Sequence, residues 1–290
     1  MSGEAGEGRT PAAQRVMMIG GAMRSGTTVI HRALCTARNS NPFLSESWFL
    51  RDLLAMYRFR LSRFAAMGED QFGPVDAYDR MIADDVAEYL RTVSARHGDP
   101  EVMILKQPEL IRSFADLARL SPEMLFLAVV RDPRDVIASM KRVRDSHARD
   151  EVAGPLAGAR TTAALCGIYG SHYAPLLEAG QALEGRLTIV RYEDFVRAPK
   201  ESVAAIGAFC GARYELDEVA GFRAEDVGNA TFDKSARARD PFSRAFWSDL
   251  YTEPLSDERI GRFPESLSAS EIGEIEARLA FIGQRFGYWG

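Results

Sequence analysis

The stretch GGAMRSGTT, residues 20–28, stands between two segments of different periodicity. Residues 16–21 (VMMIGG) are a compact apolar run, and residues 27–35 (TTVIHRALC) carry apolar side chains at helical spacing. The pattern predicts a strand, a glycine-rich turn and a helix. Such a turn presents backbone N–H groups and the positive end of a helix dipole, which together bind anions. Because residues 24–28 (RSGTT) add a guanidinium and three hydroxyls, we interpret them as an anion-binding loop.

The spacing within this loop narrows the choice of anion. From Gly21 the chain reads G-x-x-x-x-G, and Thr27 follows at the position where nucleotide-hydrolysing P-loops carry a lysine. Without that lysine, hydrolysis of a nucleoside triphosphate is disfavoured. The loop therefore predicts an anion other than the β- and γ-phosphates of ATP.

Strands and helices alternate along most of the chain. Apolar runs predict three more strands, at residues 101–105, 124–130 and 186–192, of which the second is expected to be buried. Helical patterns fall between and after them, at residues 108–120, 132–143, 156–180, 198–211 and 270–286. This alternation predicts an α/β fold with three layers, α/β/α, around a central parallel sheet, like that of P-loop NTPases.

Length and composition favour one domain. The chain has 290 residues, of which 46% are hydrophobic, enough to bury a full core. We expect a single domain over residues 15–290, and we expect the polar, glycine-rich residues 1–14 to be disordered. Within the domain, residues 46–97 contain two helical patterns with no strand between them, which predicts a helical insertion.

The first helix of the insertion, within residues 45–64, is amphipathic in pattern. The side chains expected on its buried side are Trp48, Leu53, Met56, Tyr57 and Leu61. We expect the insertion to line one wall of an acceptor site, alongside loops of the last third such as residues 241–251 (PFSRAFWSDLY).

Composition also excludes several classes of protein. A net charge of −5 and a pI near 5.6 disfavour a general nucleic-acid binder. Cys35, Cys166 and Cys210 show no metal-ligand or disulfide spacing, so we expect free thiols. The N-terminus has no signal architecture, and the longest apolar run is too short to span a bilayer, which predicts a cytoplasmic protein. Only four of the 36 basic residues are lysines, a bias typical of a bacterial source.

A second anion site is suggested by VVRDPRDVIASM, residues 129–140. Arg131 leaves the end of a buried strand, where ligands bind in open α/β sheets, and Ser139 follows two helical turns later. Asp132 is a natural N-cap of that helix, with a proline after it. The alternative is purely structural, with Arg131 and Asp135 forming a salt-bridged cap.

Together the two segments resemble the sulfotransferases that use 3′-phosphoadenosine-5′-phosphosulfate (PAPS). RSGTT resembles their 5′-phosphosulfate loop, and the pair Arg131 and Ser139 resembles their 3′-phosphate motif. Residues 186–211 and 256–263 are similar to two further family segments, in family order.

The resemblance implies two sets of residues that bind the nucleotide. The 5′-phosphosulfate would be held by Arg24, Ser25, Gly26, Thr27 and Thr28. The 3′-phosphate would be held by Arg131 and Ser139, with help from Arg191, Tyr192 and Arg262.

The catalytic groups follow from the same resemblance. Cytosolic members carry a catalytic histidine where this chain has Gln107, so that base is absent. Members similar to the tyrosylprotein and glycosaminoglycan sulfotransferases use a glutamate, which matches Glu46 here; His31 is the second candidate. Lys106 would offset charge at the transferred group, together with Arg24, which stands where cytosolic members have lysine.

The resemblance thus implies transfer of a sulfuryl group from PAPS to an acceptor hydroxyl or, second, an amine, with release of adenosine 3′,5′-bisphosphate (PAP) and without a metal. The acceptor would be a small molecule, a glycan or a lipid-like product, and no nucleic acid is expected as a partner. The sequence carries no signal for the oligomeric state. Two alternatives remain: a degenerate P-loop kinase that holds Mg²⁺-ATP through Asp132, and a non-catalytic nucleotide sensor.

Overall fold

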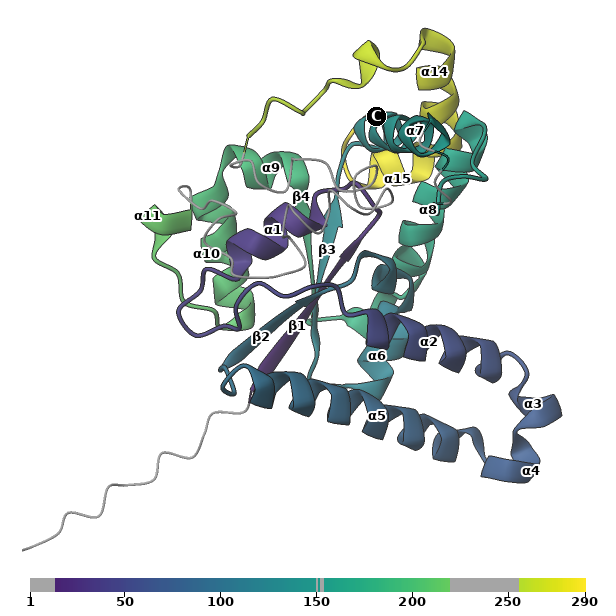
Figure 1. Cartoon of the computed structure of the whole chain (residues 1–290), viewed down its shortest axis with the longest axis vertical. Coiled ribbons are helices and arrows are strands. Elements are labelled where there is room, and N and C mark those ends of the chain that lie inside the picture. The colour runs from purple at the N-terminus through teal and green to yellow at the C-terminus, as the bar shows by residue number, and fades with distance from the viewer. Residues whose placement is uncertain (1–13, 150, 152–153, 220–255) are drawn as a thin grey trace, which may run out of the picture.

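A parallel β-sheet forms the centre of the molecule in the computed structural model, which describes residues 14–149, 151, 154–219 and 256–290. In this part of the chain the sheet has four strands in the order β2-β1-β3-β4 (Figure 1). Their bounds are Arg15–Gly21 (β1), Val102–Lys106 (β2), Leu125–Val130 (β3) and Leu187–Arg191 (β4). All pairings are parallel. The predicted α/β class and the four predicted strands are confirmed.

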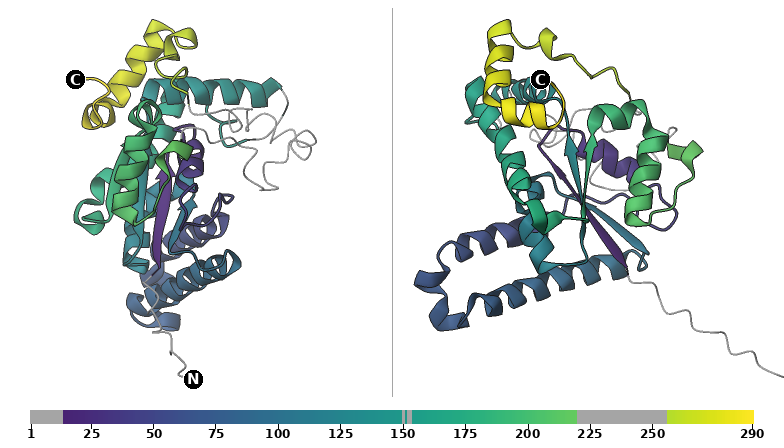
Figure 2. Two further views of the ribbon diagram at one scale, coloured as in Figure 1. Left: turned by 90° about the vertical axis from the view of Figure 1, so that its left-hand side faces the viewer. Right: turned by 180° about the vertical axis from the view of Figure 1, so that it is seen from behind.

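The sheet separates two hydrophobic cores. Side chains of a strand point alternately to its two faces, so Met17 and Ile19 of β1 join one core and Met18 joins the other. All three are fully buried. Helices lie on both sides of the sheet (Figure 2), which gives the three layers expected from the sequence.

The first face is covered by the helix that follows β1 and by those that follow β4. They are α1 (Thr27–Leu34), α9 (Tyr192–Arg197), α10 (Pro199–Cys210) and α11 (Leu216–Val219). The second face carries η1 (Pro108–Ser113), α6 (Phe114–Leu120), α7 (Pro133–Arg149), α8 (Thr162–Glu178), η2 (Gly180–Leu183), η6 (Phe263–Glu265), α14 (Ala269–Arg278) and α15 (Ala280–Arg285). Pro133 opens α7, and Asp132 Oδ1 accepts a hydrogen bond from Arg134 N at 2.9 Å, as expected of an N-cap.

A long helical hairpin projects from the second face (Figure 1). It consists of α2 (Trp48–Leu61), α3 (Phe64–Met67), α4 (Glu69–Phe72) and α5 (Val75–Arg96). The Tyr57 hydroxyl donates to Asp79 at 2.7 Å, and Arg119 contacts both groups, which ties the hairpin to α6. Leu53 and Tyr57 are buried as predicted.

The predicted burial of Trp48 and Met56 is wrong. Their exposed fractions are 47% and 46%. The buried side of α2 is made instead by Leu50, Leu53, Leu54 and Tyr57. Because α2 packs on the domain along one stripe only, its opposite face stays open.

The outer edge of β2 is covered by residues 39–47, which lead from α1 to α2. The side chain of Asn41 takes the place of a neighbouring strand by satisfying both backbone groups of Ile104. Its Oδ1 accepts from Ile104 N at 2.6 Å, and its Nδ2 donates to Ile104 O at 3.0 Å. Farther along, Ser47 N donates to Lys106 O at 3.0 Å. Because of these hydrogen bonds, residues 39–47 lie along β2, and Glu46 lies at the carboxyl end of that strand.

Other expectations have mixed outcomes. The predicted C-terminal helix is two helices, α14 and α15, which meet at Leu279. Cys35, Cys166 and Cys210 are free thiols, as expected. Residues 1–13 and 241–251 lie outside the described residues. Among the helices that the structure describes, none is both long and apolar enough to cross a membrane.

Candidate active site

The loop between β1 and α1 has the backbone of an anion-binding turn. Arg24 and Gly26 both adopt positive φ, +69° and +95°. A Cβ atom on Gly26 would lie 2.3 Å from Cδ2 of Tyr192, so a side chain is excluded there both by φ and by space. The first N–H groups of α1 have no partner within the helix. The loop thus presents backbone donors at the carboxyl end of the sheet.

Lys106 and Glu46 form a buried ion pair next to this loop. Lys106 Nζ donates to Glu46 Oε1 at 2.7 Å and to Thr28 Oγ1 at 3.1 Å. The exposed fraction is 2% for the lysine side chain and 13% for the glutamate, so the carboxylate is the member of the pair that solvent reaches. The pair therefore places the positive charge of Lys106 next to the loop and a solvent-accessible carboxylate beside that charge.

The position of Lys106 follows from the strand register. Lys106 is the last residue of β2 and is paired with Ile19 of β1, two residues before the end of that strand at Gly21. Burial lowers the pKa of Lys106, and the neighbouring Glu46 opposes that shift. A lysine so placed is a stronger acid than an exposed one. Lys106 is a buried side chain, so the alternative of a surface lysine is excluded.

His31, the second candidate for the base, is part of the core. It is fully buried, its Nε2 lies 3.1 Å from Ile104 O, and its ring packs against Phe43. Burial, with the charge of Lys106 next, lowers the pKa of His31 to about 3. The imidazole is neutral at pH 7 and has no access to an acceptor.

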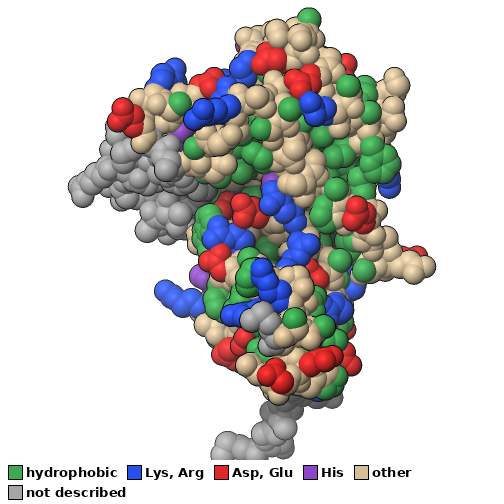
Figure 3. Space-filling view, turned by 90° about the vertical axis from the view of Figure 1, so that its right-hand side faces the viewer, with side chains coloured by type: hydrophobic (Ala, Val, Ile, Leu, Met, Phe, Trp, Pro, Cys, Tyr) green, Lys and Arg blue, Asp and Glu red, His purple; other side chains and the backbone are tan. Residues whose placement is uncertain are grey.

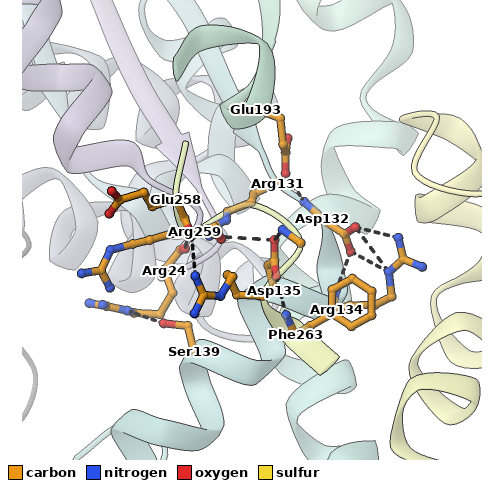
Figure 4. A network of polar contacts seen from close by, with 12 residues as sticks. Arg24, Arg131, Asp132, Arg134, Asp135, Ser139, Glu193, Glu258, Arg259 and Phe263 are labelled. Atoms are coloured by element: carbon orange, nitrogen blue, oxygen red, sulfur yellow. Dashed lines mark hydrogen bonds and ion pairs between the residues drawn. The ribbon is translucent and has the colours of Figure 1, made fainter. Parts of the chain in front are cut away.

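A second cluster gathers arginines at the ends of β3 and α7 (Figure 4). Arg24 Nε donates to Ser139 Oγ at 3.2 Å, so the predicted loop arginine turns toward the predicted 3′-phosphate motif. Arg131 Nη1 lies 3.5 Å from Arg24 O, and its Nη2 donates to Arg259 O at 2.7 Å. The guanidinium of Arg131 also lies over the Tyr192 ring, 4.4 Å from its centre.

Two arginines of this cluster were not predicted. Burial lowers the pKa of Arg142, and the charges of Arg24, Arg131 and Arg259 lower it further. We call these four arginines the arginine cluster. Arg142 stands one turn after Ser139 on α7, a spacing that could have marked it. Arg259 stands in the same segment as the predicted Arg262.

The nearby carboxylate of Asp135 forms only a long ion pair with Arg131. It lies 4.0 Å from Arg131 Nη2, and its oxygens accept from Gly261 N at 2.7 Å and Phe263 N at 3.0 Å. Asp135 therefore fixes the chain at residues 261–263, so the salt-bridged cap is not its main contact. Within the described residues, Nε of Arg131 is buried without a hydrogen-bond partner. Gathered cations with an unused buried donor are suited to binding an anion.

The other residues predicted to bind the nucleotide have varied surroundings in the structure. Ser25 and Thr27 are buried in the loop. Arg191 stacks on Tyr288 and lies 3.8 Å from Asp194. Arg262 is 57% exposed and pairs with Glu265, so the structure does not bring it into the arginine cluster. No group of His, Cys, Asp and Glu in the described ranges is arranged to hold a metal ion.

Comparison with known proteins identifies the family. A model of the "Sulfotransferase family" matches residues 17–216, so the chain belongs to that family. Protein-tyrosine sulfotransferase 2 of Gallus gallus is 32% identical over 127 residues, and protein-tyrosine sulfotransferase 1 of Mus musculus is 31% identical over the same length. Each match covers 43% of this chain and 33% of the relative, so the chain matches about a third of those proteins' length.

Solved structures with this fold include two domains of biosynthetic enzymes. The sulfotransferase domain of the Synechococcus PCC 7002 olefin synthase has a TM-score of 0.54 at 17% identity, covering 94% of this chain and 97% of that one. The sulfotransferase domain from the curacin biosynthetic pathway has a TM-score of 0.57 at 13% identity, covering 93% and 99%. These similarities establish the fold as that of sulfotransferases.

Proposed function

We propose that this chain transfers a sulfuryl group from PAPS to an acceptor hydroxyl and releases PAP. The observation that carries the proposal is the buried pair of Lys106 and Glu46 at the anion-binding loop. The arginine cluster supports it from the other end of the same loop. Arg24 joins the two places, since its backbone belongs to the loop and its side chain reaches Ser139.

The two anion-binding places fit the two charged ends of PAPS. Its phosphosulfate lies on the 5′ carbon of the ribose, and a separate phosphate lies on the 3′ carbon. We assign the first to the loop backbone at Gly26 and the hydroxyls of Ser25, Thr27 and Thr28. The second goes to the arginine cluster with Ser139, where the unpaired Nε of Arg131 is a donor that a phosphate oxygen satisfies. Tyr192 positions Arg131 by stacking.

The proposed chemistry makes one bond and breaks one. The acceptor oxygen bonds to sulfur, the bond between sulfur and the oxygen bridging to the 5′-phosphate breaks, and the acceptor proton passes to Glu46. A positioned general base contributes about 10²–10⁴-fold in rate. Lys106 is held 3.1 Å from Thr28 Oγ1 and offsets the charge that grows on the bridging oxygen.

Asp132, the metal ligand of the kinase alternative, is engaged within the chain. Oδ1 of Asp132 accepts from Arg134 N, and Oδ2 accepts from Arg134 Nη2 at 2.7 Å, so both oxygens are used within the chain. The alternative of a non-catalytic nucleotide sensor predicts the same nucleotide binding as the proposal. It differs only in predicting that no sulfuryl group is transferred.

The acceptor class is kept broad. The relatives are named for a protein tyrosine, so a phenolic hydroxyl is the first acceptor to test. A small molecule, a glycan and a lipid-like product remain the classes proposed for this chain. The hairpin of α2 and α5 begins beside Glu46, and we propose it as one wall of the acceptor site. A cytoplasmic location remains a prediction.

The donor assignment is tested by calorimetry in EDTA. PAP is expected to bind at least about 30-fold more tightly than AMP, because AMP leaves the desolvated arginine cluster without its partner. Equal affinities for the two nucleotides would contradict the 3′-phosphate site. Tighter binding of ATP, dependent on added Mg²⁺, would favour the kinase.

A further inference from the structure

The outer face of α2 exposes large apolar side chains in a row. Trp48, Met56 and Phe59 have exposed fractions of 47%, 46% and 54%. Residues eight and eleven positions apart lie on one side of a helix, so the three share a face opposite the buried Leu53 and Tyr57. Exposed apolar patches of this kind mark interaction surfaces.

Arginines are interleaved with these rings. The guanidinium of Arg51 lies 4.2 Å from the centre of the Trp48 ring, and that of Arg63 lies 4.0 Å from the centre of the Phe59 ring. Residues 48–64 contain four arginines and one aspartate, a net charge of +3 in a chain whose net charge is −5. On the side from which the hairpin projects, Figure 3 shows blue and green side chains mixed, with red acidic side chains below them. We call this face of α2, with Arg51, Arg60 and Arg63, the aromatic–arginine face. Arg58 points toward the domain, where its Nη1 donates to Arg112 O at 3.1 Å and its Nε lies 3.5 Å from Asp116 Oδ2.

A flat pair of arginine and aromatic ring suits the boundary between lipid headgroups and acyl chains. The ring and the arginine stem take the apolar side, and the in-plane N–H groups of the guanidinium face the headgroups. Arg51 already donates through Nε to Asp52 Oδ1 at 2.8 Å, so we assign the contacts with phosphate oxygens to Arg60 and Arg63. Amphipathic helices with Trp or Phe on one face and arginines beside them lie in this layer without crossing it. We propose that the aromatic–arginine face docks on a lipid bilayer that carries anionic headgroups.

Charge distinguishes this partner from a second copy of the chain. In a symmetric dimer the same face meets itself, which would set two segments of charge +3 against each other. An anionic bilayer instead presents negative charge to the whole face, and the arginines donate hydrogen bonds to its headgroups.

Docking would also orient the proposed catalytic pair. Trp48 stands two residues after Glu46, and its N–H donates to Glu46 O at 2.8 Å. The docked helix would therefore hold the backbone of Glu46 near the bilayer, while its carboxylate stays paired with Lys106. This consequence rests on the proposed function, and with it the acceptor hydroxyl belongs to a lipid headgroup.

The test is sedimentation of the full chain with vesicles. We expect binding to phosphatidylcholine vesicles that contain a quarter phosphatidylglycerol, weaker binding to pure phosphatidylcholine, and release as salt is raised. Arg60→Gln with Arg63→Gln is expected to weaken binding roughly 25-fold. Met56→Ser with Phe59→Ser is expected to weaken it roughly tenfold or more.

Matched controls change the same chemistry elsewhere. Phe281→Ser removes a ring that is 69% exposed on α15, and Arg38→Gln with Arg213→Gln removes two exposed charges on the other side of the sheet. The controls should bind vesicles like the wild type, and all variants should bind PAP normally in calorimetry. No binding of the wild type to anionic vesicles, or equal losses in variants and controls, would overturn the proposal. So would concentration-dependent dimers that Phe59→Ser abolishes. A wild type that binds vesicles but not PAP would overturn the proposed function and leave the docking intact.

Discussion

Glu46→Gln is expected to lower kcat by about 10²–10⁴-fold, because the amide cannot take the proton of the acceptor. The side chain keeps its size, and its oxygen can still accept from Lys106 Nζ, which lies 2.7 Å away in the wild type. Nucleotide binding at the arginine cluster should therefore be unchanged. The rate of PAP formation with a phenolic acceptor, together with PAP affinity by calorimetry, checks both expectations.

The same substitution removes the charge that stabilises a buried cation. Burial already lowers the pKa of Lys106 while Glu46 raises it, so the variant should lower that pKa further. Breaking a buried pair costs stability, about 3–5 kcal/mol for a fully buried one. Unfolding therefore has to be followed alongside kcat. A folded Glu46→Gln protein that keeps more than about a tenth of the wild-type kcat would contradict the base assignment.

Two further variants separate charge from position. Glu46→Asp keeps the carboxylate and withdraws it by one methylene, so it should retain stability better than kcat. Glu69→Gln on α4 removes an exposed carboxylate and should change neither quantity. If Glu46→Asp and the wild type turn over equally, alignment of the carboxylate is not what matters.

Arg131→Ala is expected to weaken PAP binding by about 2–5 kcal/mol, which is roughly 30- to 4000-fold. The Arg131 side chain is 11% exposed and its Nε has no partner within the described residues, so a bound phosphate would pair with a desolvated donor. AMP lacks the 3′-phosphate and should bind the variant and the wild type with similar affinity. Calorimetry with both nucleotides measures the difference.

Two other arginine variants serve as references for Arg131. Arg131→Lys keeps the positive charge but loses the bidentate guanidinium and its stacking on Tyr192. Its PAP affinity should therefore lie between those of the wild type and Arg131→Ala. Arg144→Ala removes an arginine of α7 that pairs with Asp145 and should leave PAP affinity unchanged. Equal losses for PAP and AMP in Arg131→Ala would mean that Arg131 acts by packing and not by binding the 3′-phosphate.

Local pattern was sufficient for the architecture because the inner strands β1 and β3 and the strand β2 are buried over most of their length, whereas the edge strand β4 is only half-buried. The run at residues 124–130 has no polar residue, and β3 is buried from Phe126 to Val130. The glycine turn after β1 could also be predicted from the sequence, because Gly26 stands at a position that a side chain cannot occupy. Lys106 and Glu46 were both candidates from the sequence. Their 2.7 Å contact depends on the path of residues 39–47 along β2, which periodicity does not encode.

The errors have a common physical origin in tertiary packing. Trp48 and Met56 were expected inside because apolar residues on an amphipathic helix usually are. The hairpin meets the domain along one stripe, however, and that stripe is filled by Leu50, Leu53, Leu54 and Tyr57. In the segment of residues 256–263, motif position favoured Arg262. The bonds of Asp135 to Gly261 N and Phe263 N fix the turn, and Arg259 is the arginine beside Arg131.

Transfer of label from ³⁵S-PAPS in EDTA tests the central claim most directly. The account predicts that the wild type moves the label to a phenolic, glycan or lipid acceptor and forms one PAP for each label moved. It also predicts that Glu46→Gln, when folded and able to bind PAP, moves almost none. Tight PAP binding by the wild type with no transfer to any of these acceptor classes would contradict the account and favour a nucleotide sensor.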